Sequence, residues 1–257
     1  VAGRGRLALL VGIVAIEKET GGRIVFRQRQ RFVPWGDPTT DLNFVYVMGR
    51  DNRIYAVYKR EEEGRDHIDW WNYNVDASVV GSPAVRELSL YYVNTEGVVV
   101  AIRLSRVTGR HDWDFRTDAR IKTPLTLVGN TIYVGATDGK LYSLKATGGV
   151  TRKDRQNWLL PYNAGSGIVS RPYVVDDLVL MQTAETGFHA VKSDDGTGAW
   201  TLPGVYRFAS RGPRHVHLVN PAGNLVGVES TPNGEAGLQG APSVSPRWTL
   251  PTADFRY

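Results

Sequence analysis

The sequence predicts an all-β fold, a six-bladed β-propeller whose blades are four-stranded antiparallel sheets. A motif of two apolar strands, a tight turn between them and a final aromatic residue recurs along the 257 residues. Multi-strand repeats of about 40 to 50 residues are typical of propellers. Steps of 44, 43, 45, 42 and 48 residues separate the aromatic anchors, which are Phe26, Trp70, Trp113, Trp158, Trp200 and Trp248. Because the copies fill the chain, we expect one domain over residues 1–257.

Each copy justifies its own pair of strands. Gly, Asn or Asp in the turn supplies the positive φ angles that tight hairpins need, and Pro is tolerated where a strand begins. The predicted pairs are 7–11 and 13–16, 44–48 and 54–57, 88–93 and 98–102, 132–134 and 141–143, 178–181 and 188–191, and 216–219 and 225–228. Small residues in the second strand of four copies let a neighbouring sheet approach, and we expect the anchor ring to fill the remaining gap. These small residues are Ala56, Ala101, Ser143 and Ala190.

The two ends of the chain predict how the ring closes. The first copy lacks an opening strand, whereas a short segment with Pro251 follows the last anchor, Trp248. We therefore expect residues 252–257 to pair with residues 7–11, so that one blade is shared by both termini.

Composition excludes several function classes. The chain has no Cys, which excludes disulfides, iron–sulfur clusters, thiolate zinc sites and cysteine nucleophiles. No apolar run approaches the ~18 residues of a membrane span, so no direct membrane span is expected. The formal charge is +5, and the densest basic run places Arg27, Arg29 and Arg31 on one strand face. Such a stripe suits the solvated face of an outer strand, and no nucleic-acid-binding motif accompanies it. We expect no nucleic-acid partner.

The fourth copy carries a family resemblance. Its sequence runs through Thr123-Pro124, Tyr133-Val134-Gly135, Asp138-Gly139, Leu141-Tyr142-Ser143 and Thr147-Gly148 to Trp158. This pattern resembles the PQQ-like repeat of quinoprotein-type propellers. The third and fifth copies match it well, the second in part, and the first and sixth weakly. The resemblance implies a fold more than an activity.

Two branches of that family carry different implications. Quinoprotein dehydrogenases resemble eight-bladed rings with vicinal cysteines, a calcium site and a catalytic Asp. This chain has no Cys and no matching cluster, so we expect no cofactor and no PQQ-dependent dehydrogenase activity. The chain is more similar to the outer-membrane assembly lipoprotein scaffolds, although it lacks their lipidated cysteine. That branch implies partner proteins and a periplasmic or cell-surface location.

The residues show no catalytic or metal-binding constellation. His215 and His217 share a strand face, as metal ligands might, but no third ligand lies nearby in the sequence. No nucleophile, base and oxyanion donor occur together. We expect no catalytic residues, no metal and no enzyme activity.

Binding residues are better candidates. In a propeller, the loops between blades and the central hairpin of each blade open on the same face. The inter-blade loops hold aromatic and Arg residues, which are enriched at protein contacts. The candidates for partner binding are Trp35, Trp71, Tyr73, Arg116, Arg120, Tyr162, Tyr206 and Arg207.

These observations predict a non-catalytic scaffold or protein–protein interaction module within a larger assembly. The alternative is a propeller that uses the central channel either to bind a small molecule or a carbohydrate or to hydrolyse it. Acidic and aromatic side chains converging on the channel would distinguish the alternative. A glycan partner belongs to that alternative.

Overall fold

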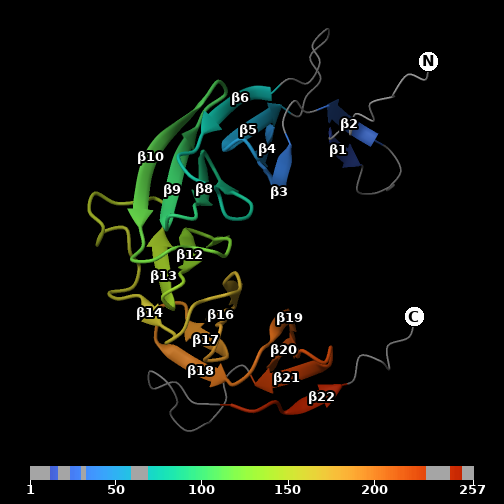
Figure 1. Cartoon of the computed structure of the whole chain (residues 1–257), viewed down its shortest axis with the longest axis vertical. Coiled ribbons are helices and arrows are strands. Elements are labelled where there is room, and N and C mark those ends of the chain that lie inside the picture. Colours follow the sequence, from blue (N-terminus) through green and yellow to red (C-terminus); the bar gives the residue numbers. More distant parts are fainter. Residues whose placement is uncertain (1–11, 17–23, 30–32, 59–68, 230–243, 251–257) are drawn as a thin grey trace, which may run out of the picture. The chain divides into compact units, whose positions relative to one another are not determined.

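The structure, a computed structural model, describes residues 12–16, 24–29, 33–58, 69–229 and 244–250. Within these ranges every regular element is a β-strand and there is no helix (Figure 1). Accordingly, the same ranges contain no helix that is long and apolar enough to cross a membrane. The all-β prediction is confirmed.

The strands form five four-stranded antiparallel sheets and one two-stranded sheet. The two-stranded sheet pairs β1 (Gly12–Ile16) with β2 (Ile24–Arg29). The first four-stranded sheet in chain order contains β3 (Pro34–Thr40), β4 (Phe44–Gly49), β5 (Arg53–Tyr58) and β6 (Asp69–Asn74). The second contains β7 (Ala84–Arg86), β8 (Ser89–Val93), β9 (Val98–Leu104) and β10 (Gly109–Arg116). The remaining sheets contain β11 (Thr126–Val128), β12 (Thr131–Gly135), β13 (Lys140–Lys145) and β14 (Tyr162–Asn163), β15 (Tyr173–Val175), β16 (Leu178–Gln182), β17 (Phe188–Lys192) and β18 (Gly198–Leu202), and β19 (Arg207–Arg211), β20 (His215–Val219), β21 (Leu225–Glu229) and β22 (Trp248–Leu250).

Within each sheet the strands lie in chain order, which is the order found in a propeller blade. We number these sheets blade 2 to blade 6, following the predicted copies, and β1–β2 belong to the first copy. Five four-stranded blades are therefore present where the sequence predicts them. The two further strands expected for the first blade, at 7–11 and 252–257, lie outside the described residues.

The chain separates into two compact units, which are described separately. Unit 1 comprises residues 1–91 and 102–112, and unit 2 comprises residues 92–101 and 113–257. The core of unit 1 includes Val45, Val47, Tyr55 and Val57. In unit 2, one apolar cluster surrounds Trp200 and another contains Trp158. Nearly continuous apolar runs explain these cores, because middle strands such as β4 and β16 are buried on both of their faces.

The anchors pack as the sequence predicts, against small residues. Trp200 pairs in register with Ala190 and is fully buried. Trp158, 3% exposed, faces Gly196, where an added Cβ would lie 2.6 Å from the indole. A side chain at position 196 would collide with the indole, and the φ of 78° at Gly196 is one that other residues rarely adopt. Only glycine therefore fits this position.

In blade 2 the residue that pairs with the small Ala56 is Trp71, the neighbour of the predicted anchor Trp70. A β-bulge causes the shift: Ala56 pairs with Trp71 and the next residue, Val57, pairs with Asp69. Trp71 is 6% exposed and contacts the position of Gly109 at 3.0 Å. It is therefore a core residue of unit 1 and offers no ring to a partner at the surface.

Candidate functional site

The central hairpins of the blades have the turn geometry that the sequence predicts. A residue with positive φ stands in each turn: Asn52, Gly97, Gly139, Gly187 and Gly223. At Gly97 and Gly139, glycine is required for a second reason, because the backbone of the following inter-blade loop lies close to the turn. A Cβ on Gly97 would lie 2.3 Å from the carbonyl oxygen of Ala119, and one on Gly139 would lie 2.8 Å from that of Ser166.

Backbone hydrogen bonds tie these hairpins to the loops between blades. In unit 2, the amide of Ala164 donates to the carbonyl of Gly139 at 2.9 Å, within one blade. Between neighbouring blades, the amide of Thr137 donates to Arg120 at 2.9 Å, and that of Ala184 donates to Gly167 at 2.9 Å. Hairpins and inter-blade loops therefore form one braced surface in unit 2, which we call the hairpin–loop face.

A pocket of about 480 Å³ opens on this face between blades 4 and 5. Its lining comes from two inter-blade loops and two central hairpins, and comprises Lys122, Thr123, Thr137, Ser166, Gly167, Ile168, Val169, Ala184 and Glu185. Val169 is 56% exposed, whereas Ile168 is buried and forms part of the apolar floor. The pocket therefore combines an apolar floor with hydroxyl and charged groups at its rim.

The charged groups of the rim have no partners within the described chain. Lys122 and Glu185 are exposed, and neither forms an ion pair with a described residue. The Oγ of Ser166 accepts a hydrogen bond from the amide of Glu185 at 2.9 Å, which fixes the backbone at that position. Thr123, 4% exposed, has a buried hydroxyl without a hydrogen-bond partner. Lys122 is therefore available to an anionic group of a ligand, and Glu185 to a cationic group.

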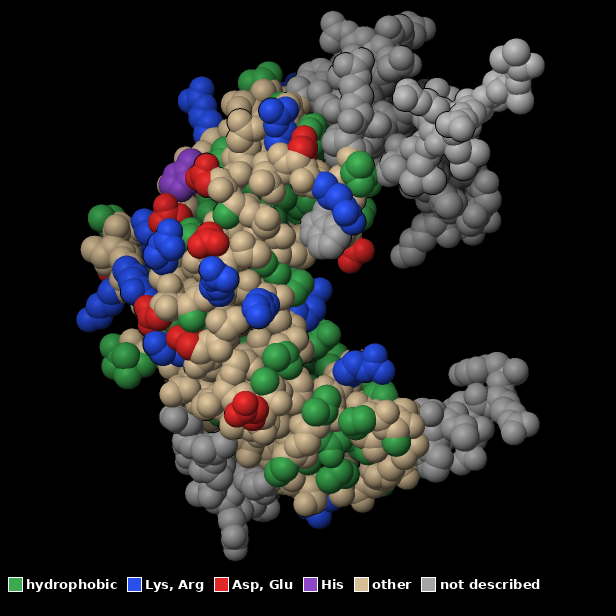
Figure 2. Space-filling model, in the orientation of Figure 1, with side chains coloured by type: hydrophobic (Ala, Val, Ile, Leu, Met, Phe, Trp, Pro, Cys, Tyr) green, Lys and Arg blue, Asp and Glu red, His purple; other side chains and the backbone are tan. Residues whose placement is uncertain are grey.

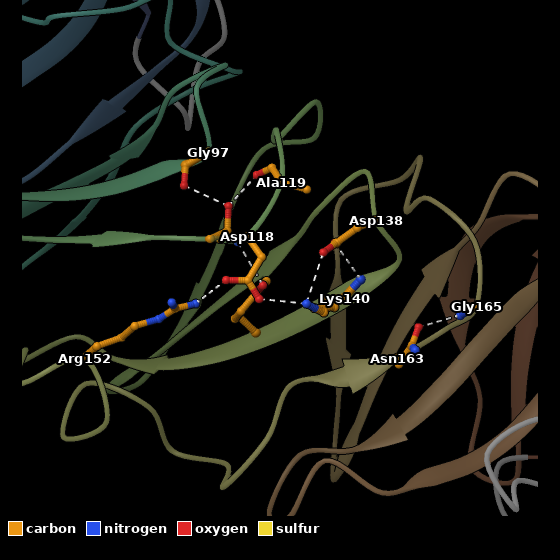
Figure 3. A network of polar contacts seen from close by, with 10 residues as sticks. Gly97, Asp118, Ala119, Asp138, Lys140, Arg152, Asn163 and Gly165 are labelled. Atoms are coloured by element: carbon orange, nitrogen blue, oxygen red, sulfur yellow. Dashed lines mark hydrogen bonds and ion pairs between the residues drawn. The ribbon is translucent and has the colours of Figure 1, made fainter.

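An exposed ionic network holds the loop between blades 3 and 4 (Figure 3). The carboxylate of Asp118 accepts hydrogen bonds from Lys140 and from Arg152, both at 2.7 Å. These donors lower the pKa of Asp118 to about 2. Its amide donates to the hydroxyl of Tyr142 at 3.2 Å. Because the Asp118 side chain is 44% exposed, the network positions the loop but is screened by solvent.

A buried polar network holds the corresponding junction between blades 4 and 5. Nδ1 of His189 lies 3.0 Å from the Tyr162 hydroxyl, and Nε2 lies 3.0 Å from Oγ1 of Thr186. Thr186 donates its own hydroxyl hydrogen to the carbonyl of Ala164 at 2.7 Å. Thr186 must therefore accept from Nε2–H of His189, which leaves Nδ1 to accept from Tyr162.

Burial dictates the charge state of this network. His189 is fully buried, and desolvation lowers its pKa from 6.5 to about 4. Burial likewise raises the pKa of Tyr162 to about 12. Both groups are therefore neutral at pH 7, and the junction is a hydrogen-bonded bridge without formal charge.

The loop after blade 5 is fixed by one glutamine. The buried Gln182 side chain accepts from the amide of Tyr206 at 2.8 Å and donates to the carbonyl of Gly204 at 3.1 Å. Tyr206 is consequently held half-buried at the edge of the hairpin–loop face.

The structure separates the eight predicted partner-binding residues. Trp35, Trp71 and Tyr73 belong to unit 1, and the other five to unit 2. Trp35 lies in β3, and Tyr73 is half-buried in β6. These two stay predictions, whereas the burial of Trp71 argues against a surface role.

Within unit 2 the predicted residues differ in exposure. Arg120 and Arg207 are exposed, and Arg116 is exposed with its guanidinium 3.4 Å from the carbonyl oxygen of Glu96. Tyr162 is 5% exposed, and its hydroxyl forms a hydrogen bond with Nδ1 of His189. It supports the face from beneath and does not present its ring there.

Sequence reasoning missed Lys122, Glu185 and His189. One signal could have identified His189: it precedes the small residue Ala190, as Tyr55 precedes Ala56 and Tyr142 precedes Ser143. The structure shows a shared role, since each of these three side chains forms a hydrogen bond near its hairpin. Nothing in the sequence marks Lys122 and Glu185, which become neighbours of one pocket only through blade packing.

Metal-ligand geometry is not found among the described residues, where no three His, Asp or Glu side chains come together to hold an ion. His215 and His217 instead lie against the ring of Trp248, with centroids 6.2 and 5.5 Å away. Nδ1 of His217 also lies 2.9 Å from Oγ of Ser210.

Solved structures similar to the chain show the same fold. BamB from Moraxella catarrhalis matches with a TM-score of 0.67 and 14% identity, over 96% of this chain and 71% of that one. Hsv2 from Kluyvelomyces marxianus matches with a TM-score of 0.56 and 13% identity, over 80% and 66% of the two chains. The computationally designed Ika8 protein matches with a TM-score of 0.53 and 11% identity, over 91% and 84%. No curated protein matches the chain in sequence.

The family comparison covers more than half of the chain. The model of the family described as outer membrane protein assembly factor BamB matches residues 12–157. This match extends from β1 through the third and fourth copies, in which the sequence shows the PQQ-like repeat most clearly. The chain therefore belongs to the PQQ-like propeller family of the outer membrane protein assembly factor BamB.

Proposed function

We propose that this chain is a non-catalytic scaffold that binds other protein subunits of a larger assembly, in the periplasm or at the cell surface. Family membership supports the class of function, since the family is described as an assembly factor. A scaffold needs a surface that keeps its shape while a partner binds, and the hairpin–loop face has one because its loops are braced by backbone hydrogen bonds.

One observation carries the location of the contact. The rim of the pocket between blades 4 and 5 presents Lys122 and Glu185, which form no ion pair with a described residue, together with the exposed apolar side chain of Val169. Protein interfaces usually have a hydrophobic centre and a polar rim. The pocket has the same arrangement, with apolar side chains surrounded by charged groups of both signs. Arg120, on the loop between blades 3 and 4, and Arg207, the first residue of β19, are further exposed cations of unit 2.

Charge reversal tests this proposal. The tagged chain is purified from its own cells, and the stoichiometry of co-purifying proteins is measured for the wild type and for the Lys122→Glu and Glu185→Lys variants. We expect a stoichiometric complex with the wild type and at least about tenfold weaker association for each variant. Lys192→Glu is the matched control, because Lys192 is exposed on β17 and does not line the pocket. A wild-type chain that purifies alone would exclude the scaffold, and equal complex formation by all variants would exclude the pocket rim.

We propose further that the five blades and the β1–β2 strands belong to a six-bladed ring closed by residues 252–257 pairing with residues 7–11. The support is the length of the repeat and the two strands already present from the first copy. Removal of the last eight residues should lower Tm by more than about 5 °C, since an open ring loses a strand and its packing. Removal of residues 1–6 is the control and should leave Tm unchanged. Closure by these strands would be refuted by an unaltered Tm in the C-terminal deletion.

A further inference from the structure

The outer edge of blade 4 carries a longer insertion than the one-residue bulge between β17 and β18 in blade 5. Leu144 pairs with Gln156, and Leu141 pairs with Tyr162. Leu141 and Leu144 on β13 are 3 positions apart, whereas their partners Tyr162 and Gln156 are 6 positions apart. The outer strand therefore contains three extra residues. Inserted residues at a sheet edge typically turn particular side chains outward or end the pairing.

The extra residues display two leucines to solvent. Trp158 turns inward, where it is 3% exposed and donates from Nε1 to the carbonyl of Ser193 at 3.0 Å. The next two residues, Leu159 and Leu160, are 81% and 73% exposed. We call residues 159–161 the leucine bulge. By contrast, the residues that the outer strand β10 exposes are charged or polar: Arg110, His111, Asp112, Asp114 and Arg116.

The loop between β13 and the outer strand of blade 4 exposes a third aliphatic side chain. Val150 is 93% exposed. The loop behind it is held by hydrogen bonds from the amide and hydroxyl of Thr151 to Asp154, and from the amide of Lys145 to the carbonyl of Arg155 at 2.7 Å. The loop that carries Val150 is therefore tied to β13 by hydrogen bonds.

Positive charge accompanies the aliphatic groups. Residues 147–161 contain Arg152, Lys153 and Arg155 against one acidic residue, Asp154. Arg152 is already paired with Asp118 at 2.7 Å, so Lys153 and Arg155 supply the charge that no acidic side chain balances by an ion pair in the described chain. Arg155 donates to the backbone carbonyls of Gly149 and Asp114, which carry no formal charge. Lys153 is exposed and forms no ion pair with a described residue. Figure 2 shows Lys and Arg side chains at the left edge, interspersed with Asp and Glu, at the level of β13 and β14 in Figure 1, and hydrophobic side chains protrude at the same edge.

We propose that the leucine bulge and the adjacent basic loop form a peripheral docking site for an anionic lipid surface. Exposed aliphatic side chains on a projecting edge can enter the acyl region of a bilayer without a matching pocket, and neighbouring cations attract anionic headgroups. A protein partner is the less favoured occupant, because protein contacts concentrate in aromatic and Arg anchors and Leu is under-represented there. This contact is independent of the pocket on the hairpin–loop face.

Vesicle sedimentation tests the proposal on the full chain. The probes are vesicles of phosphatidylcholine alone and vesicles that also contain phosphatidylglycerol. We expect binding to the anionic vesicles only, weakened by added salt. The double variant Leu159→Ser with Leu160→Ser should bind at least about tenfold more weakly, since two buried aliphatic groups are lost. Lys153→Glu should also weaken binding, by a few-fold.

A matched control separates the bulge from general surface hydrophobicity. Leu88→Ser with Val107→Ser removes two aliphatic groups that are 64% and 72% exposed elsewhere in the chain, and it should bind vesicles as the wild type does. The proposal is overturned if the wild type fails to bind anionic vesicles, or if the Leu159/Leu160 variant binds them equally well. It is also overturned if that variant keeps vesicle binding but loses a co-purifying protein, which would assign the bulge to a protein contact. The Lys122→Glu variant should retain vesicle binding, so failure of this proposal and failure of the scaffold proposal give different results.

Discussion

Two junctions between blades of unit 2 solve the same structural problem with different chemistry. Between blades 3 and 4, the inter-blade loop is held by exposed ion pairs of Asp118 with Lys140 and Arg152. Between blades 4 and 5, it is held by a buried neutral network of Tyr162, His189 and Thr186. The difference implies that the buried junction determines stability, whereas the exposed junction contributes little and can vary with salt.

Truncation of His189 should produce the largest effect. His189→Ala leaves a cavity and deprives the Tyr162 hydroxyl and Oγ1 of Thr186 of their buried partner. We expect a loss of about 4 kcal/mol in the free energy of unfolding, measured by urea denaturation. His217→Ala is the matched control, because His217 is only half-buried, and it should cost less than about 1.5 kcal/mol. Equal costs for the two variants would contradict the distinction between the junctions.

Acid should weaken the buried junction before the exposed one. Burial lowers the pKa of His189 from 6.5 to about 4. Between pH 6.5 and pH 4, this side chain is therefore protonated in the unfolded chain but neutral in the folded chain. Stability from this group is complete above pH 6.5 and falls by about 3 kcal/mol as the pH drops to 4. The free energy of unfolding, measured across this range, should fall less steeply for His189→Ala than for the wild type. Parallel curves for the two proteins would rule out the assignment.

Asp118 titrates in a different window. Its pKa is lowered from 3.8 to about 2, so its stabilising contribution is present above pH 3.8 and disappears as the pH falls towards 2. The two junctions are therefore separable by pH within a single series of unfolding measurements.

Removal of one hydroxyl gives a smaller test of the buried junction. Tyr162→Phe leaves Nδ1 of His189 without a donor while the packing of the ring is kept. We expect a cost of about 1 to 2 kcal/mol in the free energy of unfolding. Tyr206→Phe is a suitable control, since Gln182 holds Tyr206 through its backbone amide. A neutral effect of Tyr162→Phe would show that the hydroxyl makes no net contribution.

The exposed junction should give the smallest effect. Asp118→Asn removes the charge that Lys140 and Arg152 share. We expect a change below about 1 kcal/mol at low salt, and a smaller one at high salt, because solvent screens the pairs. Denaturation of the wild type and the variant at two salt concentrations measures it. A cost that is large and independent of salt would mean that this junction is as important as the buried one.

Much of the fold could be predicted because local chemistry determines it. Gly97, Gly139 and Gly187 mark turns whose positive φ is needed whatever surrounds them. The sequence did not show that Trp71, next to the predicted anchor Trp70, pairs with Ala56, because a β-bulge depends on how β5 and β6 pair and two adjacent tryptophans carry no signal of that register. Strand periodicity alone cannot locate such a bulge.

The candidate site was predictable only in outline. The topology of a propeller indicates which loops share a face, and the hydrogen bonds of Thr137 and Ala184 agree with it. Lys122 and Glu185 lie 63 positions apart (185 − 122) on loops of different copies, so their common pocket depends on packing between blades. The sequence predicts Tyr162 as a partner-binding aromatic of an inter-blade loop, but this residue is 5% exposed and its hydroxyl forms a hydrogen bond with His189.

The central claim is that the hairpin–loop face of unit 2 contacts a partner protein, and site-specific photocrosslinking in native cells tests it most directly. A crosslinking residue at Thr137, exposed at the pocket, is compared with one at Arg110, exposed on the outer strand β10. The account predicts a discrete crosslinked protein from position 137 and none from position 110. Crosslinks from position 110 alone, or from neither position, would contradict it.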